Sequence, residues 1–175
     1  MIRIGLVPIG QIPESLVTFL ATQLKDKLKS NDVAVEIHTA LFLPAKTTPA
    51  FLLARLSHLL NKDQQKYLIG LVDADISESE DDFIYNREEF NRRMGIVALT
   101  RLRPEFYKLP ANDALFPARV LKLILREIAL LLGLGLCQDK KCLMYHARNL
   151  HEIDIKYPSF CLDCWPLLNT AISKK

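Results

Sequence analysis

Four cysteines near the carboxyl end of the chain constrain its fold more than any other feature. They stand in two close pairs, Cys137-x4-Cys142 and Cys161-x2-Cys164, and the chain has no other cysteine. A tetrahedral zinc site needs thiolates that converge, and two close pairs joined by a loop supply them readily because each pair already lies on one turn. The spacing predicts one structural zinc ion bound by all four sulfurs at about 2.3 Å. The alternatives are four unrelated reduced cysteines, or a redox pair at Cys161 and Cys164.

The zinc site divides the chain into two parts. Residues 143–160, between the cysteine pairs, are poor in core-type side chains, so we expect this stretch to depend on the metal for its order. The sequence shows no internal repeat, low-complexity tract or linker. We therefore expect a single domain over 1–175, with an α/β portion at 1–135 and a zinc-bound, loop-rich segment at 136–175.

Composition excludes two classes of partner. The net charge is only +3, and the 23 basic residues are scattered among 20 acidic ones, so we expect no nucleic-acid partner. The longest uncharged stretch of the most apolar segment, 128–138, is too short to cross a hydrocarbon layer of about 30 Å. We therefore expect no membrane partner and a cytoplasmic localisation, in which cysteines are thiols or metal ligands rather than disulfides.

Strands and helices alternate through the first two thirds of the chain. Short β-rich runs alternate with amphipathic stretches of helical period, which predicts an α/β fold, a compact single domain with a mixed twisted sheet. Strands are expected at 2–7, 33–37, 67–72, 83–85 and 95–100, and helices at 13–28, 49–60 and 113–132. Asp113 is the expected N-cap of the last of these helices, and Gly133 and Gly135 are expected to end it. After Gly135 we expect loops and short helices at most.

The end of this last helix and the cysteines together carry a family resemblance. The residues concerned are Glu127, Gly133, Cys137, Cys142, Met144, Cys161 and Cys164. From Glu127 onward the chain resembles the archaemetzincins, a family of zinc metalloproteases, and the stretches 95–107 and 70–75 are also similar to that family. The resemblance implies a metzincin-like fold with an active-site-type helix, and a position for Met144 in the turn beneath the catalytic metal.

The family's three zinc-binding histidines have no counterpart here. Arg126, Leu130 and Leu136 stand in their positions. A guanidinium stays protonated and a leucine has no donor atom, so none of the three can hold zinc. The resemblance therefore implies that the catalytic zinc is absent and that Glu127 is a vestigial general base. His146 and His151, the nearest histidines, are expected to be solvated or hydrogen-bonded surface groups.

The function expected from this altered site is binding. A metzincin-like cleft would keep a rim strand, expected near 95–102, that can pair with an extended peptide. Arg126 could bind a carboxylate, unless Glu127, Asp73, Asp75 or the acidic loop 78–82 already pairs with it. We therefore predict a non-catalytic peptide-binding or regulatory pseudoprotease. The alternatives are an active zinc-dependent metallopeptidase with an unrecognised metal site, and a purely structural remnant.

Overall fold

Five strands form the central sheet of the computed structural model, which describes residues 1–28, 32–60, 66–79 and 82–174. The strand order is β2-β1-β3-β7-β6. β1, β2, β3 and β7 run parallel, and β6 pairs antiparallel with β7. The strands are β1 (Ile2–Ile9), β2 (Val33–Ile37), β3 (Lys66–Val72), β6 (Asn86–Glu89) and β7 (Met94–Ala98).

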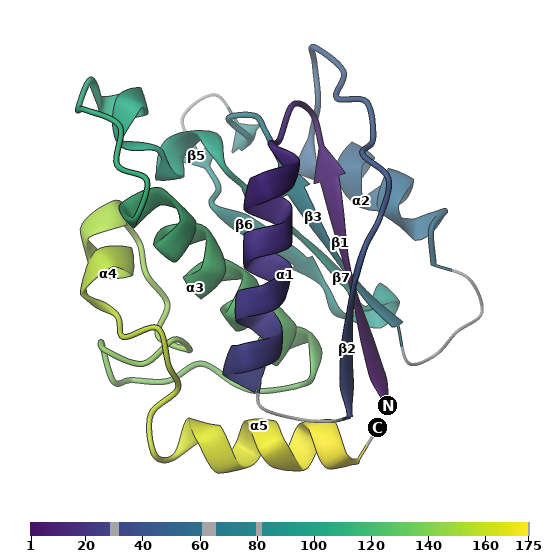
Figure 1. Cartoon of the computed structure of the whole chain (residues 1–175), viewed down its shortest axis with the longest axis vertical. Coiled ribbons are helices and arrows are strands. Elements are labelled where there is room, and N and C mark those ends of the chain that lie inside the picture. Colours follow the sequence, from purple (N-terminus) through teal and green to yellow (C-terminus); the bar gives the residue numbers. More distant parts are fainter. Residues whose placement is uncertain (29–31, 61–65, 80–81, 175) are drawn as a thin grey trace.

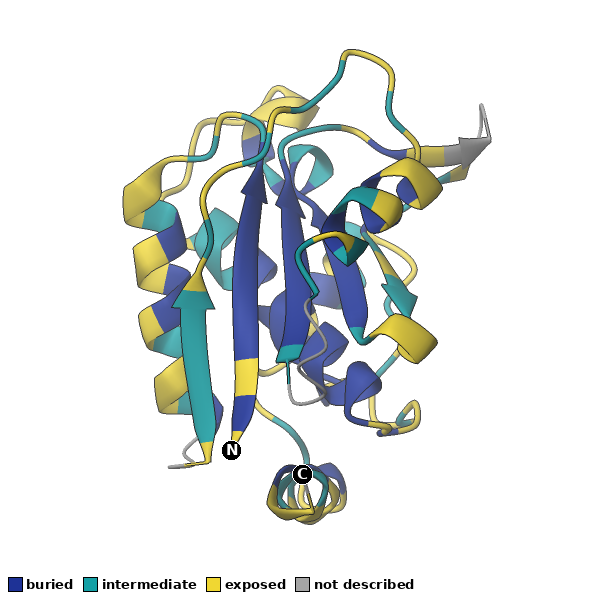
Figure 2. Ribbon diagram, turned by 90° about the vertical axis from the view of Figure 1, so that its right-hand side faces the viewer, coloured by how far each residue is buried: buried dark blue, intermediate teal, exposed yellow. Residues whose placement is uncertain are grey.

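Helices cover both faces of this sheet (Figure 1). α1 (Glu14–Leu28) and α3 (Leu115–Leu131) pack on one face, and α2 (Pro49–Ser57) packs on the other. The central strands are buried on both sides, as Figure 2 shows for β1 and β3. This two-sided burial explains why they read as continuous apolar runs rather than as alternating patterns. The mixed sheet between helical layers confirms the predicted α/β fold class.

One stripe of α3 carries buried charges that attach the carboxyl-terminal segment. Arg119 donates from Nε and Nη2 to the carboxylate of Asp154, at 2.7 Å in each case. One turn further along, the Lys122 ammonium donates to the backbone carbonyls of Ile153 and Asp154 at 3.0 and 2.9 Å. Lys122 therefore binds carbonyl groups at the end of α4 (Leu150–Ile155), where a helix leaves its carbonyls unpaired.

The chain ends in a longer helix than the sequence predicted. α5 (Cys164–Ser173) spans ten residues and lies at the end of the molecule where α1 and β2 meet (Figure 1). Its buried side chains, Cys164, Leu168 and Ile172, recur every four residues and belong to the main core. The expectation of short helices at most was wrong because this spacing covers only three side chains, one of them a cysteine expected to bind zinc. None of the described helices is long and apolar enough to cross a membrane.

Of the two edge strands, β2 was predicted at 33–37 but β6 was not. The rim strand was expected near 95–102, but β7 lies between β3 and β6 and so has neither edge exposed. The sequence of β6, Asn-Arg-Glu-Glu, lacks the β-branched and aromatic residues that mark strands. Its position is decided by pairing with β7, which local sequence does not reveal.

The start of α3 also differs from the prediction. Ala114, not Asp113, is the N-cap residue, and its side chain makes no capping hydrogen bond. The side-chain oxygen of Asn112 instead accepts from the N–H groups of Ala114 and Leu115, at 3.1 and 2.8 Å. An asparagine two residues before the N-cap thus accepts hydrogen bonds from N–H groups at the start of the helix, as a capping aspartate would.

Candidate functional site

The four cysteine sulfurs converge at the base of the carboxyl-terminal segment. Their Sγ atoms all lie within 4.8 Å of one another, and Cys137 and Cys161 approach to 3.8 Å. None of the four forms a disulfide. Sulfurs at about 2.3 Å from a tetrahedral zinc ion stand about 3.8 Å apart, so the cluster fits that ion. The predicted convergence of Cys137, Cys142, Cys161 and Cys164 is confirmed.

Backbone N–H groups point at two of these sulfurs. Cys142 Sγ accepts from the N–H groups of Met144 and Cys161 at 3.4 Å, and Cys137 Sγ accepts from Asp139 at 3.4 Å. Such bonds stabilise the negative charge of a thiolate, which is the form that binds metal. The chemistry of the cluster therefore matches a closed, structural zinc site with no open coordination position.

A second candidate site is built around a buried carboxylate. Glu127, on α3, is fully buried. Its Oε1 accepts a hydrogen bond from the side-chain amide of Asn86 on β6 and lies 3.4 Å from Nη1 of Arg126. Its Oε2 has no hydrogen-bond partner among the described residues. Burial, and then the nearby charge of Glu88, raise the pKa of Glu127 to about 8.

Gly95 makes room for this carboxylate. A Cβ atom built on Gly95 would lie 2.8 Å from Oε2 of Glu127, closer than such atoms approach. Gly95 on β7 and Asn86 on β6 are therefore part of the site, and sequence reasoning gave neither a role. Asn86 lies 41 residues before Glu127 in the chain, so local sequence does not indicate their contact. The sequence signal that was available is a glycine in the middle of a buried strand, which often marks a close approach.

Arg126 is buried beside Glu127 but is loosely held. Only 5 % of it is exposed. Its Nη1 lies 3.4 Å from Glu127 Oε1, its Nη2 lies 3.5 Å from Nδ1 of His146, and its Nε has no partner among the described residues. Both contacts are at the long limit for a hydrogen bond. Its head group therefore has donor capacity that neither contact uses fully.

Two of the acidic residues expected as alternative partners of Arg126 pair with other arginines. Asp73 pairs with Arg103 at 2.8 Å, and Asp75 pairs with Arg101 at 2.7 Å. In the acidic loop 78–82, the side chains at 78–81 are not described. Among the predicted partners whose side chains are described, Glu127 contacts Arg126, despite the angle between consecutive helix residues.

A hollow of about 520 Å³, lined in part by Arg126, opens between β6 and the end of α3. Leu130 is almost fully buried in its wall, whereas Leu136 is 58 % exposed at its rim. The residues that line the hollow are Asn86, Arg87, Glu88, Phe90, Arg126, Leu130, Leu134, Gly135, Leu136 and His146. Arg126, Leu130 and Leu136, which were expected at the positions of the family's zinc-binding histidines, thus line one hollow.

These three positions do not fit a zinc ion. Arg126, Leu130 and Leu136 present a cation and two hydrocarbon groups, none of which donates a lone pair to a metal. His146 and His151 are both exposed, as expected. Among the residues that the structure describes, one group of possible metal ligands has converging ligand atoms, and it consists of the four cysteines.

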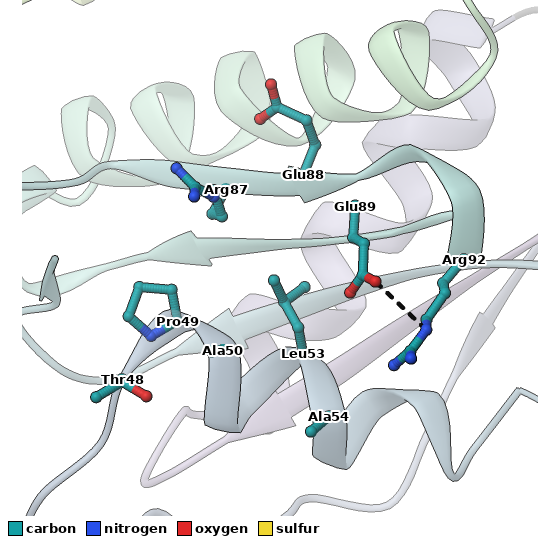
Figure 3. A pocket seen from close by; sticks show the side chains of 9 residues that line it. All are labelled: Thr48, Pro49, Ala50, Leu53, Ala54, Arg87, Glu88, Glu89 and Arg92. Carbon is teal, nitrogen blue, oxygen red and sulfur yellow. Dashed lines mark ion pairs between the residues drawn. The ribbon is translucent and has the colours of Figure 1, made fainter.

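β6 separates this hollow from a second one of about 540 Å³, lined by β6 and α2. Successive side chains of a strand point to opposite faces. Figure 3 accordingly shows Glu88 directed toward α3, and Glu89 directed toward α2 and paired with Arg92 at 3.3 Å. The face of β6 that carries Glu88 is also the face from which Asn86 reaches Glu127.

The outer edge of β6 is open. No described strand pairs with it, since β6 is the last strand in the order of the sheet. The Ala98 N–H donates to the Tyr85 carbonyl at 2.8 Å, which sets the alternation of the ladder. The N–H and C=O groups of Asn86 and Glu88 therefore face away from β7. They are placed to bond with an added strand.

Comparison with known proteins connects this architecture to one family. The pattern described as Peptidase family M54 matches residues 52–170. The archaemetzincin of Pyrococcus abyssi is 31 % identical to this chain, over 97 % of this chain and 95 % of that protein.

Solved structures share the fold. A zinc-dependent peptidase from Methanocorpusculum labreanum superposes with a TM-score of 0.83 at 24 % identity, covering 95 % of this chain and 100 % of the other. The archaemetzincin of Methanopyrus kandleri superposes with a TM-score of 0.79 at 25 % identity, covering 98 % and 96 %.

Proposed function

We propose that this chain, which belongs to peptidase family M54 and is similar to archaemetzincins, is a non-catalytic member of the family. It would bind an extended peptide in the hollow between β6 and α3. The observation that carries this proposal is the composition of that hollow. Arg126, Leu130 and Leu136 line it at the positions expected for the three family histidines. Glu127 lies buried beside Arg126, and the outer edge of β6 is open.

The proposed loss of catalysis follows from the chemistry of these side chains. Zinc hydrolysis requires an ion that activates water and a carboxylate that takes the proton. Glu127 has its Oε1 bound by Asn86 and lies against Arg126. A carboxylate held in this way serves as an acceptor for its neighbours. Without a metal, water keeps its high pKa and is a poor nucleophile at neutral pH.

The proposed binding mode is addition of a strand to β6. The outward backbone groups of Asn86 and Glu88 would pair with the peptide, and its alternate side chains would enter the hollow. The exposed side chains of Leu136 and Phe90 at the rim supply apolar contact. Main-chain bonds would give affinity, and the hollow would select the side chains.

Zinc content tests the metal part of the proposal. Purified protein should hold one zinc ion per chain, released by Cys164→Ser, because the four-cysteine site is the fitting one. Peptidase assays with added zinc should remain at background. Two zinc ions per chain, with hydrolysis that a chelator abolishes and zinc restores, would favour the alternative of an active metallopeptidase.

Peptide titration tests the binding part. We expect an acetylated and amidated Thr-Val-Thr-Val-Thr-Val peptide to bind and to protect the Glu88 N–H from hydrogen exchange. Glu88→Pro removes that donor at a position where an edge strand tolerates proline, so it should weaken binding. Glu88→Gln keeps the donor and is the matched control. If no extended peptide binds, the chain is better described as a structural remnant.

A further inference from the structure

The Arg126 guanidinium is buried without a full set of acceptors. A guanidinium has five N–H donors, and this one makes two contacts, at 3.4 and 3.5 Å, with Nε unpartnered among the described residues. A buried charge is costly unless it is paired and hydrogen-bonded. Arg126 also lines the hollow of about 520 Å³. An acceptor that enters the hollow would therefore relieve a cost already present in the protein.

The charges around Arg126 favour an anion as that acceptor. Lys156 lies close enough to Arg126 for the two positive charges to repel, and this repulsion adds to burial in lowering the pKa of Lys156. The Lys156 ammonium donates to the backbone carbonyls of Leu143 and Tyr145, which carry no net charge. Two buried cations thus stand close together, and one of them, Arg126, lines the hollow.

Two carboxylates oppose these cations. Glu88 on β6 lines the hollow together with Arg87 and His146. Glu127 on α3 does not line it but lies buried beside Arg126. Glu88 lies on the partly exposed edge strand, where solvent screens its charge. Glu127 is fully buried, so its protonation decides how much negative charge already faces Arg126.

We propose that Arg126 and His146 form a subsite for a carboxylate group of the bound peptide, and that Glu127 competes with this carboxylate for Arg126. The inference rests on the proposed peptide-binding function and names the chemistry of its ligand. An arginine fork binds a carboxylate through two parallel N–H···O bonds. The single long contact to Glu127 leaves that fork available. The carboxylate is supplied by an acidic side chain or by the end of a peptide.

Competition by Glu127 makes ligand binding depend on pH. The pKa of Glu127 is raised to about 8. Below that pH it is protonated and uncharged, so Arg126 pairs with the ligand. Above it, Glu127 ionises, pairs with Arg126 and repels the incoming carboxylate. The dissociation constant of an acidic peptide should therefore rise above pH 8, by up to about tenfold per pH unit.

Three hexapeptides test the subsite at pH 7. The first is Thr-Val-Thr-Glu-Thr-Val with both ends blocked, the second replaces its Glu with Gln, and the third is the Gln peptide with a free carboxyl end. We expect one of the two carboxylate peptides to bind about tenfold more tightly than the blocked Gln peptide. Which one does so identifies the source of the carboxylate. Arg126→Met should remove the difference, and Arg126→Lys, which keeps the charge without the fork, should retain only part of it.

A pH series tests the competition. The preference for the carboxylate peptide should fall between pH 7 and pH 9.5 in the wild-type protein and stay level in Glu127→Gln. Glu105→Gln, at an exposed position outside the hollow, is the matched control and should keep the wild-type pH dependence. If Glu127→Gln keeps the wild-type fall, the assignment of Glu127 as competitor is wrong.

The outcomes separate this inference from the function on which it rests. If all three peptides bind equally, the carboxylate subsite is refuted and the peptide-binding function stands. If none binds, the peptide-binding function fails, and the subsite is judged with succinate alone by the NMR signal of the Arg126 Nε–H. A saturable shift of that signal supports the subsite, and an unchanged signal overturns it.

Discussion

Glu127→Gln should change how the stability of the protein depends on pH. In the folded chain the pKa of Glu127 is about 8, against an ordinary value of 4.5. Between these values the folded state holds a proton that the unfolded state has lost. The free energy of unfolding therefore falls as pH rises, by about 1.4 kcal/mol per unit, and levels off above pH 8. Over pH 6 to 9 the loss amounts to about 2 to 3 kcal/mol.

Glutamine cannot ionise, so the variant should lack this loss. Its amide keeps an oxygen to accept from Asn86, and it has nearly the shape of the protonated acid. Urea unfolding at pH 6, 7, 8 and 9 measures the two slopes. Glu105→Gln, at an exposed position, is the matched control and should follow the wild-type slope. Equal slopes for the wild-type protein and Glu127→Gln would refute the argument, because Glu127 would then ionise alike in both states.

Three further predictions concern stability and metal. Cys164→Ser should lower zinc content and unfold the carboxyl-terminal segment before the α/β portion, seen as early proteolysis after residue 135, since the metal orders that segment. Arg119→Met should lower the free energy of unfolding by about 2 to 4 kcal/mol in urea, because it removes a bidentate pair of 2.7 Å bonds with Asp154. Gly95→Ala should cost about 1 to 3 kcal/mol in the same assay, since its Cβ would meet Glu127 Oε2 at 2.8 Å; an unchanged melting curve would contradict the close approach.

The parts of the site that could be predicted from the sequence are those encoded locally. Cys137 and Cys142, like Cys161 and Cys164, lie within single turns, so spacing and ligand type together indicated convergence. The central parallel strands could also be predicted from their apolar runs, because strands buried on both faces need continuous hydrophobic residues.

The edge strand β6 could not be predicted in this way. β6 owes its place to the ladder with β7, and its charged side chains give no strand signal of their own. The peptide-binding rim was consequently expected one strand too far into the sheet. A half-solvated edge strand can carry almost any polar sequence, so its identity emerges only when its partner is placed.

That Arg126, Leu130 and Leu136 carry no metal-donor atom is a property of the sequence alone. What surrounds those side chains was decided by the tertiary structure. Packing of α3 under the edge of the sheet buries Glu127 and brings Asn86 to it across 41 residues of chain. It also places Arg126 in the wall of a hollow, where its Nε–H has no acceptor among the described residues. Residue types are read directly from the chain, whereas burial and long-range partners exist only once the helix and the strand meet, because desolvation is a property of the assembled environment.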